Sequence, residues 1–131
     1  MAFIRIVLCL LTSTGLAMAV YAGTPQEQLA DLVAQAGSSP NAAQGQEFFN
    51  AKHGREWSCA SCHHALPTGE GTHANTGKSI SALAPAFNPK RFTDPAKSDK
   101  WFRRNCNDVL ARACTPAEKA DMLAWLISLK P

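Results

Sequence analysis

Two cysteines and a histidine stand close together near the middle of the chain, in the run Cys59-Ala60-Ser61-Cys62-His63. Two thiols separated by two residues can each add to one vinyl group of a single porphyrin. A histidine directly after the second thiol is then held under the ring, where an imidazole nitrogen reaches the iron. The spacing therefore predicts one covalently attached c-type haem, with Cys59 and Cys62 as its thioether links and His63 as the proximal iron ligand.

Two other chemistries use closely spaced cysteines, and neither fits the rest of the chain. A structural zinc site needs a second, separated pair of ligands. The nearby candidates are His64, which adjoins His63, and His73. A thioredoxin-like redox pair is typical of a βαβ pattern, and no such pattern surrounds this motif. We therefore expect haem attachment here.

The ligand on the second side of the iron is harder to find in the sequence. Met122 is the only methionine beyond residue 18, and its place in an apolar helical pattern is typical of core packing. His53, His64 and His73 are more typical of surface or hydrogen-bonding positions, and residues 85–112 contain neither histidine nor methionine. The residues alone leave the second iron position unassigned.

The first 22 residues have the composition of a secretory signal. Arg5 precedes an apolar stretch that runs to Val20, and Val20-Tyr21-Ala22 offers a small-residue cleavage site, with Ala17-Met18-Ala19 as the competing one. The segment is too short for a membrane span. We expect residues 1–22 to be removed, which leaves one domain, residues 23–131, in the periplasm.

Removal of this segment changes the cysteine count. Of the five cysteines, Cys9 leaves with the signal and the haem takes two, so Cys106 and Cys114 remain. An oxidising compartment favours a disulfide between them, and two unpaired buried thiols are the alternative. A continuous helix would separate these residues by ~12 Å, which is too far for a disulfide. The helix that holds Cys106 is therefore expected to end before Cys114.

Helix starts are marked by capping residues followed by proline. The sequence predicts helices over residues 25–36, over 39 to about 52, from 94 onward, and from 115 towards the C-terminus. The stretch between the haem motif and residue 94 is rich in glycine and proline and shows no alternation of strand length. We expect an all-α fold of about four to five short helices, joined by long loops around the haem.

One pair of helices is expected to cross closely. A glycine in one helix lets another helix approach, and aromatic side chains fill the crossing. Gly45 and Phe49 in the second helix, with Met122 and Trp125 in the last, fit this pattern. Such a crossing is typical of class I cytochromes c.

Basic residues gather in the last third of the chain. The formal net charge of +3 at pH 7 says little about partners once the signal and two haem propionates are counted, and we expect no nucleic-acid partner. The cluster is interpreted either as a solvated face or as a docking patch for an acidic redox partner. Arg91 is the candidate for a propionate contact. The cluster contains Lys90, Arg91, Lys97, Lys100, Arg103, Arg104 and Arg112.

Five runs in the second half of the chain match a known pattern: residues 83–85 (LAP), 89–94 (PKRFTD), 104–108 (RNCND), 114–121 (CTPAEKAD) and 124–126 (AWL). They closely resemble the family of the sphaeroides haem protein, SHP, small periplasmic class I cytochromes c with an unusual distal side. The resemblance implies that Asn105 binds the iron through its amide oxygen, and that Cys106–Cys114 is the family's disulfide. A related branch, cytochrome c″, carries histidine at the position of Asn105. Without the resemblance, Asn105 would be interpreted as a helix C-cap.

The resemblance also implies a function. Ferric iron accepts a neutral amide oxygen better than the softer ferrous iron does. Reduction is therefore expected to release Asn105 and to open the ferrous haem to O₂, NO or CO. The family suggests a dihaem cytochrome c as electron donor, and we expect a monomer. A plain electron carrier and an enzyme that turns over O₂, NO or peroxide remain alternatives, with gas binding and electron transfer favoured over a dedicated enzyme.

Overall fold

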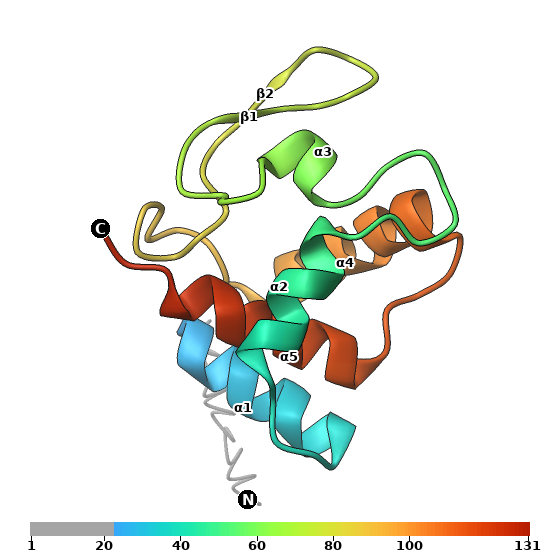
Figure 1. The fold of residues 1–131 in the computed structure, drawn as a ribbon. Coiled ribbons are helices and arrows are strands. Elements are labelled where there is room, and N and C mark those ends of the chain that lie inside the picture. The colour runs from blue at the N-terminus through green and yellow to red at the C-terminus, as the bar shows by residue number, and fades with distance from the viewer. Residues whose placement is uncertain (1–22) are drawn as a thin grey trace, which may run out of the picture.

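The computed structural model describes residues 23–131, and the predicted signal, residues 1–22, lies outside them. Within the described part, five helices follow one another along the chain, and a short β-ladder lies between the third and fourth (Figure 1). The all-α prediction is therefore confirmed. No helix in this part is both long and apolar enough to cross a bilayer. The elements are α1 Pro25–Ala36, α2 Ala42–Asn50, α3 Ala60–His63, β1 Gly71–Thr72, β2 Ser79–Ile80, α4 Pro95–Leu110 and α5 Pro116–Ser128.

Side-chain caps fix the starts of three helices where the sequence predicted them. The Thr24 hydroxyl accepts the Glu27 N–H, and the Glu27 carboxylate accepts the Thr24 N–H in return. Thr115 and Glu118 repeat this capping box at α5, and the carboxylate of Asp94 caps α4. Each cap satisfies backbone donors that the first helical turn leaves free.

The second helix is shorter than the predicted span of residues 39 to about 52. Asn41 caps it, because its carboxamide oxygen accepts the N–H groups of Ala43 and Gln44. The N–H of Asn41 itself donates to the Asp121 carboxylate of α5 at 2.7 Å. This tertiary contact, which sequence spacing does not reveal, sets where α2 begins.

The loop after α3 is also more regular than predicted. β1 and β2 pair in antiparallel fashion, with Gly71 opposite Ile80 and Thr72 opposite Ser79. The expectation of a wholly irregular stretch is therefore wrong for these residues. The ladder is too short to show the alternation by which strands are recognised.

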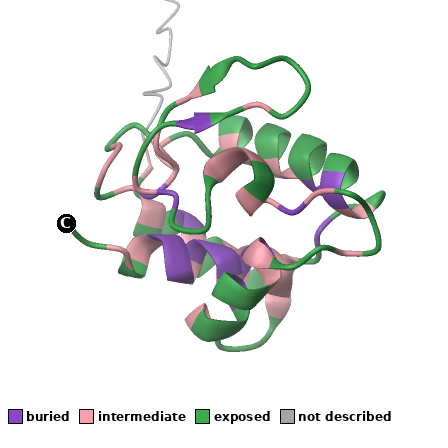
Figure 2. Ribbon diagram, turned by 45° about the horizontal axis from the view of Figure 1, so that its top comes forward, coloured by how far each residue is buried: buried purple, intermediate pink, exposed green. Residues whose placement is uncertain are grey.

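The core centres on α5, which packs against α1 and α2. Leu123 and Leu126 of α5 are fully buried, and Figure 2 shows the buried residues concentrated on this helix. α2 crosses α5 at Gly45, where an added Cβ would collide with the backbone of Asp121 and Met122. The predicted glycine crossing is therefore present, and it brings the two backbones into direct contact.

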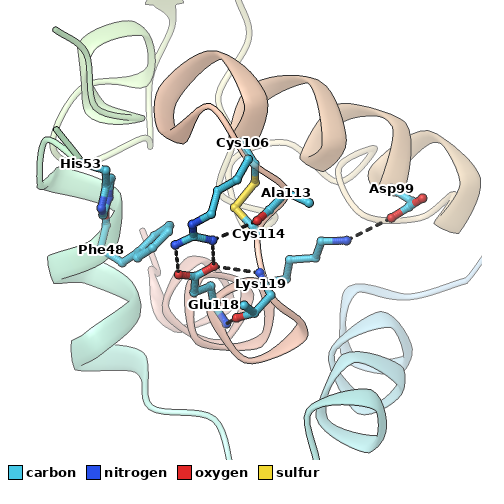
Figure 3. Close-up of a disulfide and its surroundings, with 10 residues drawn as sticks. Phe48, His53, Asp99, Cys106, Ala113, Cys114, Glu118 and Lys119 are labelled. Atoms are coloured by element: carbon cyan, nitrogen blue, oxygen red, sulfur yellow. Dashed lines mark hydrogen bonds and ion pairs between the residues drawn. A yellow bond between two sulfur atoms is a disulfide. The ribbon is translucent and has the colours of Figure 1, made fainter. Parts of the chain in front are cut away.

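A disulfide ties α4 to the start of α5. Cys106 and Cys114 are bonded, with their Cα atoms 5.6 Å apart (Figure 3). α4 ends at Leu110, and Ala111 turns the chain in a left-handed conformation with φ 57°. The helix thus ends before Cys114, as the spacing requires.

An exposed ion pair closes the same loop. Arg112 donates to both carboxylate oxygens of Glu118, at 2.7 and 2.9 Å. Because Glu118 also caps α5, this pair connects the loop to the first turn of the helix. The hydrogen bond from Arg112 lowers the pKa of Glu118.

Gly45→Ala should destabilise the protein by about 1–3 kcal/mol, because the new methyl group forces two helical backbones apart. Denaturant unfolding of the holoprotein measures the loss. Gly69→Ala is the matched control, since a Cβ there meets nothing within 4 Å and should change stability by less than about 0.5 kcal/mol. Equal effects of the two substitutions would show that the crossing is not close-packed.

Replacing both Cys106 and Cys114 with alanine should lower the free energy of unfolding by about 2.5 kcal/mol. The disulfide closes a loop across a sequence separation of 8, and the estimate is the entropy that such a crosslink removes from the unfolded chain. Guanidinium unfolding of the oxidised holoprotein provides the measurement. Wild-type protein treated with a thiol reductant should match the variant, and an unchanged midpoint in both samples would contradict the prediction.

Candidate functional site

A cavity of about 1260 Å³ opens between α3 with its hairpin on one side and α2, α4 and α5 on the other. Sites for small molecules usually measure ~300–1,000 Å³, so this cavity has room for a ligand as large as a porphyrin. Its apolar wall includes Phe49, Leu83, Phe87, Phe92 and Leu126. A flat apolar ligand with two polar tails would complete such a core.

A single helical turn presents the C-x-x-C-H motif to this cavity. The carbonyl of Cys59 accepts the N–H of His63 at 3.1 Å, which closes the turn. Just before it, the N–H of Ser58 donates to the Ser61 hydroxyl at 3.0 Å. Residues three and four positions apart share one face of a turn. Cys59, Cys62 and His63 accordingly all line the cavity.

The chemistry of these three side chains fits haem attachment better than metal binding by thiolates. Cys59 and Cys62 are not joined by a disulfide. Burial raises the pKa of Cys59 to about 11, so its thiol is protonated at neutral pH. Among residues 23–131, no group of three or more His, Cys, Asp or Glu side chains is arranged to hold a metal ion. A zinc site is therefore not supported.

His63 is held as a neutral imidazole. Burial lowers its pKa to about 4, and the charges of Arg91 and His64 act in the same direction. A neutral imidazole nitrogen is the form that ligates a metal. Its ring lies 6.2 Å from that of Phe49, measured between centroids, and Phe49 in turn packs against Trp125 at 5.0 Å. The core of α2 and α5 thus sets the position of His63.

The hairpin of β1 and β2 braces the turn from its other side. An added Cβ at Gly71 would collide with the carbonyl of Cys62, and the N–H of Ala74 donates to the Cys62 sulfur at 3.4 Å. His73 lines the cavity, and its buried Nδ1 has no hydrogen-bond partner among the described residues. An unsatisfied buried nitrogen on a cavity wall indicates that a bound group completes the site.

α4 supplies a second long wall of the cavity, and Asn105 lies on it. Asn105 is inside α4, five positions before its last residue, Leu110, and the C-cap residue is Ala111. The interpretation of Asn105 as a helix C-cap is therefore wrong. α4 contains no histidine or methionine. The neutral side chains of α4 that line the cavity and could donate an oxygen to iron are two amides and a hydroxyl. They come from Asn105, Asn107 and Ser98.

Of the other candidates for an iron ligand, His73 lines the cavity from the hairpin that braces Cys62, and His53, His64 and Met122 are less suitably placed. His53 turns back onto α2, and its Nε2 lies 2.8 Å from the carbonyl oxygen of Phe48 (Figure 3). His64 is exposed and follows the motif with φ 64°. Neither residue lines the cavity. Met122 does line it, but its side chain is 4% exposed and belongs to the core cluster with Phe49, as its spacing predicted.

Arg91, the candidate for a propionate contact, lies on the cavity wall and is half-buried. Its Nε donates to the carbonyl of Ala82 at 3.0 Å, and its Nη2 donates to that of Ser81 at 2.8 Å. A guanidinium has five N–H groups, so two bonds leave donors for a further partner. Arg91 thus fixes the loop at Ser81 and Ala82 whether or not it also meets a propionate.

Sequence reasoning left several cavity-lining aromatic residues unassigned, among them Trp101 and Phe92. Trp101 of α4 faces it with 41% of its surface exposed. Phe92 lies before α4 with φ 57°, a left-handed conformation that bulky residues seldom adopt, and its ring packs 6.1 Å from that of Phe102. The periodicity of α4 was the only signal for Trp101, and no pattern marks the backbone of Phe92.

Sequence comparisons agree with this geometry. A family model described as "Domain of unknown function (DUF1924)" matches residues 35–126. The chain is 45% identical over 107 residues to the cytochrome c-type protein SHP of Cereibacter sphaeroides, a match that covers 79% of this chain and 82% of that protein. It is 44% identical over 94 residues to cytochrome c″ of Methylophilus methylotrophus, covering 69% of this chain and 65% of that protein.

Solved structures extend the agreement to the fold. Oxidised SHP, described as an oxygen-binding cytochrome c, aligns with a TM-score of 0.77 and 43% identity, over 82% of this chain and 98% of that one. Oxidised cytochrome c″ from Methylophilus methylotrophus aligns with a TM-score of 0.71 and 35% identity, over 82% and 95%. The predicted cytochrome c fold is therefore confirmed, and so is the predicted cofactor, one covalently bound haem c. The chain therefore belongs to the family of SHP and cytochrome c″, which are monohaem cytochromes c.

Proposed function

We propose that this protein is a periplasmic cytochrome c whose haem accepts a diatomic gas only after reduction. The observation that carries the proposal is the position of Asn105, a carboxamide on a cavity-lining helix that offers neither histidine nor methionine. Cys59 and Cys62 hold the haem through thioether bonds, and His63 is the proximal iron ligand. Asn105 would be the distal ligand of the oxidised protein, and Arg91 would contact a propionate.

The proposed gate is the release of the Asn105 carboxamide from the iron after reduction, and it follows from the weak donor strength of that group. The haem supplies an iron that changes between ferric and ferrous and that takes a diatomic gas at an open ferrous face. A neutral, hard oxygen donor binds ferric iron more tightly than ferrous iron. With haem bound, Asn105 would therefore hold the ferric iron and would withdraw after reduction. The oxidation state thus shifts the population of two side-chain positions.

The packing of the described chain supports a fixed proximal side. His63 ends a helical turn that the hairpin and Phe49 brace. α4 lines the opposite side of the cavity, and the extensive helix packing of this fold joins α5 to α1 and α2. After release, the N–H group of the Asn105 carboxamide can donate a hydrogen bond to a gas molecule in the cavity.

Several features support the proposed location and partners. The signal-like residues 1–22 direct the chain out of the cytoplasm. The Cys106–Cys114 disulfide fits an oxidising compartment. SHP is described as oxygen-binding, which supports O₂, with NO and CO as related ligands. The electron comes from a redox protein, and a dihaem cytochrome c is the donor proposed from the family resemblance.

Asn105→His should keep the ferrous protein six-coordinate and low-spin, because imidazole binds ferrous iron well. If imidazole occupies the iron in about nine of ten ferrous molecules, the apparent CO affinity falls about tenfold. Optical spectra of the ferric, ferrous and CO-treated ferrous proteins measure both effects.

Asn107→His is the matched control, since it makes the same substitution two residues further along the same helix. It should leave the ferrous protein high-spin and able to bind CO like the wild type. A wild-type ferrous protein that is low-spin and indifferent to CO would reject the gating proposal in favour of a plain electron carrier. Catalytic consumption of O₂, NO or peroxide with a donor would instead indicate an enzyme.

A further inference from the structure

Basic side chains of α4 lie at the haem cavity, where Lys97 and Arg104 line it and Lys100 does not. Lys97, Lys100 and Arg104 recur at intervals of three and four residues, so they share one face of the helix. All three are exposed, and Figure 2 shows α4 open to solvent along most of its length. We call these three residues, together with Trp101, the α4 basic face.

The charges of this face are not neutralised within the described part of the chain. Residues 23–131 contain two ion pairs, Arg112–Glu118 and Lys119–Asp99. In the second pair, Lys119 of α5 binds Asp99, the acidic residue directly before Lys100 (Figure 3). Asp99 is therefore not available to neutralise Lys100. The remaining acids of this helix region, Asp94 and Asp108, lie near its two ends and form no ion pair with the face. A local excess of positive charge therefore faces solvent.

Trp101 connects this charge to the cavity. Its ring lines the cavity and remains 41% exposed, and the guanidinium carbon of Arg104 lies 5.7 Å from the ring centroid. An aromatic residue beside arginine is the composition typical of the centre of a protein interface. Asn105, on the same helix, lines the cavity as well. A molecule seated on the α4 basic face would therefore lie at the edge of the haem site.

We propose that the α4 basic face is the docking surface for an acidic electron-transfer protein, an inference that rests on the proposed need for an electron donor. The donor protein loses one electron, and the ferric haem gains it and becomes ferrous. Opposite charge on the two surfaces accelerates the encounter and orients the donor over the cavity. Docking thus occurs on the helix that carries the proposed gate.

The composition of the face favours this occupant over others. A helix that lies on a membrane needs a broad apolar side towards the lipid, whereas the exposed face here has Trp101 as its one large apolar residue. A second copy of the same face would bring like charges together, which is unfavourable. An acidic protein surface satisfies both the cations and the aromatic residue.

The test uses the ferric holoprotein and reduced flavodoxin, a strongly acidic flavoprotein, as the electron donor. Stopped-flow absorbance gives the second-order rate constant of haem reduction for the wild type, Lys100→Glu and Lys130→Glu. The two variants change the net charge equally, and both positions are exposed, but Lys130 follows α5 and lies outside the face. Lys100 does not line the cavity, so its substitution leaves the haem site intact.

At low ionic strength, Lys100→Glu should lower the rate constant about tenfold, and Lys130→Glu less than about twofold. The difference should vanish near 1 M salt, where screening extends only ~3 Å. Equal losses in both variants would overturn the proposal, since net charge alone would then explain them. A rate that is independent of salt would overturn it too. Binding to phosphatidylserine vesicles that is lost in Lys100→Glu, without an effect on the rate, would replace the protein partner with a membrane.

Addition of CO to each dithionite-reduced protein separates this inference from the proposed function. Lys100→Glu should bind CO as the wild type does, because the substituted residue lies outside the cavity. Proteins that ignore CO but retain the charge-specific rates would reject the gas-binding function and leave the docking surface standing. Proteins that bind CO but show no charge-specific rates would reject the docking surface alone.

Discussion

Gly45 lets the backbones of α2 and α5 touch, and the position of the haem site depends on this crossing. One turn beyond Gly45, Phe49 reaches from α2 to Trp125 on α5 and to the ring of His63. The crossing therefore fixes the proximal side of the cavity through a short series of packed rings. In so small a domain, few side chains remain to fill the space opposite, and the haem takes the place of the missing core.

The other side of the cavity is tied to the same helix by a covalent bond. The Cys106–Cys114 disulfide joins the residue after Asn105 to the residue before the N-cap of α5. α5 is thus connected to both walls of the cavity: to the His63 side through side-chain packing, and to α4 through the disulfide. In the proposed gate, the residue that would move is Asn105, directly before the disulfide-bonded Cys106 of this second wall.

Much of this organisation is readable from local sequence signals. Threonine or aspartate followed by proline marks the starts of α1, α4 and α5, because each cap bonds backbone groups only a few residues away. The C-x-x-C-H motif is equally local, since one helical turn brings its three side chains together. The start of α2 was misplaced because Asn41 is held by Asp121, 80 residues away along the chain. Long-range contacts of this kind leave no trace in residue spacing.

The distal side of the cavity was even harder to predict from the sequence. An asparagine in the middle of an exposed helix has no distinctive pattern, and only the resemblance to a known family singled out Asn105 over Asn107. Arg91 shows the converse, because its charge suggested a propionate contact while its clearest bonds in the structure are to two loop carbonyls. The spacing of α4 places Trp101 on a cavity-facing helix, yet its proximity to the cavity became clear only from the fold.

The most direct measurement is a pair of crystal structures of the holoprotein, one oxidised and one reduced. We expect the Asn105 side-chain oxygen to lie within bonding distance of the iron, opposite His63, in the oxidised crystal and to have moved away in the reduced one. A sulfur atom, an imidazole or no protein atom at that position in the oxidised crystal would contradict the account. An Asn105–iron bond that survives reduction would contradict it equally.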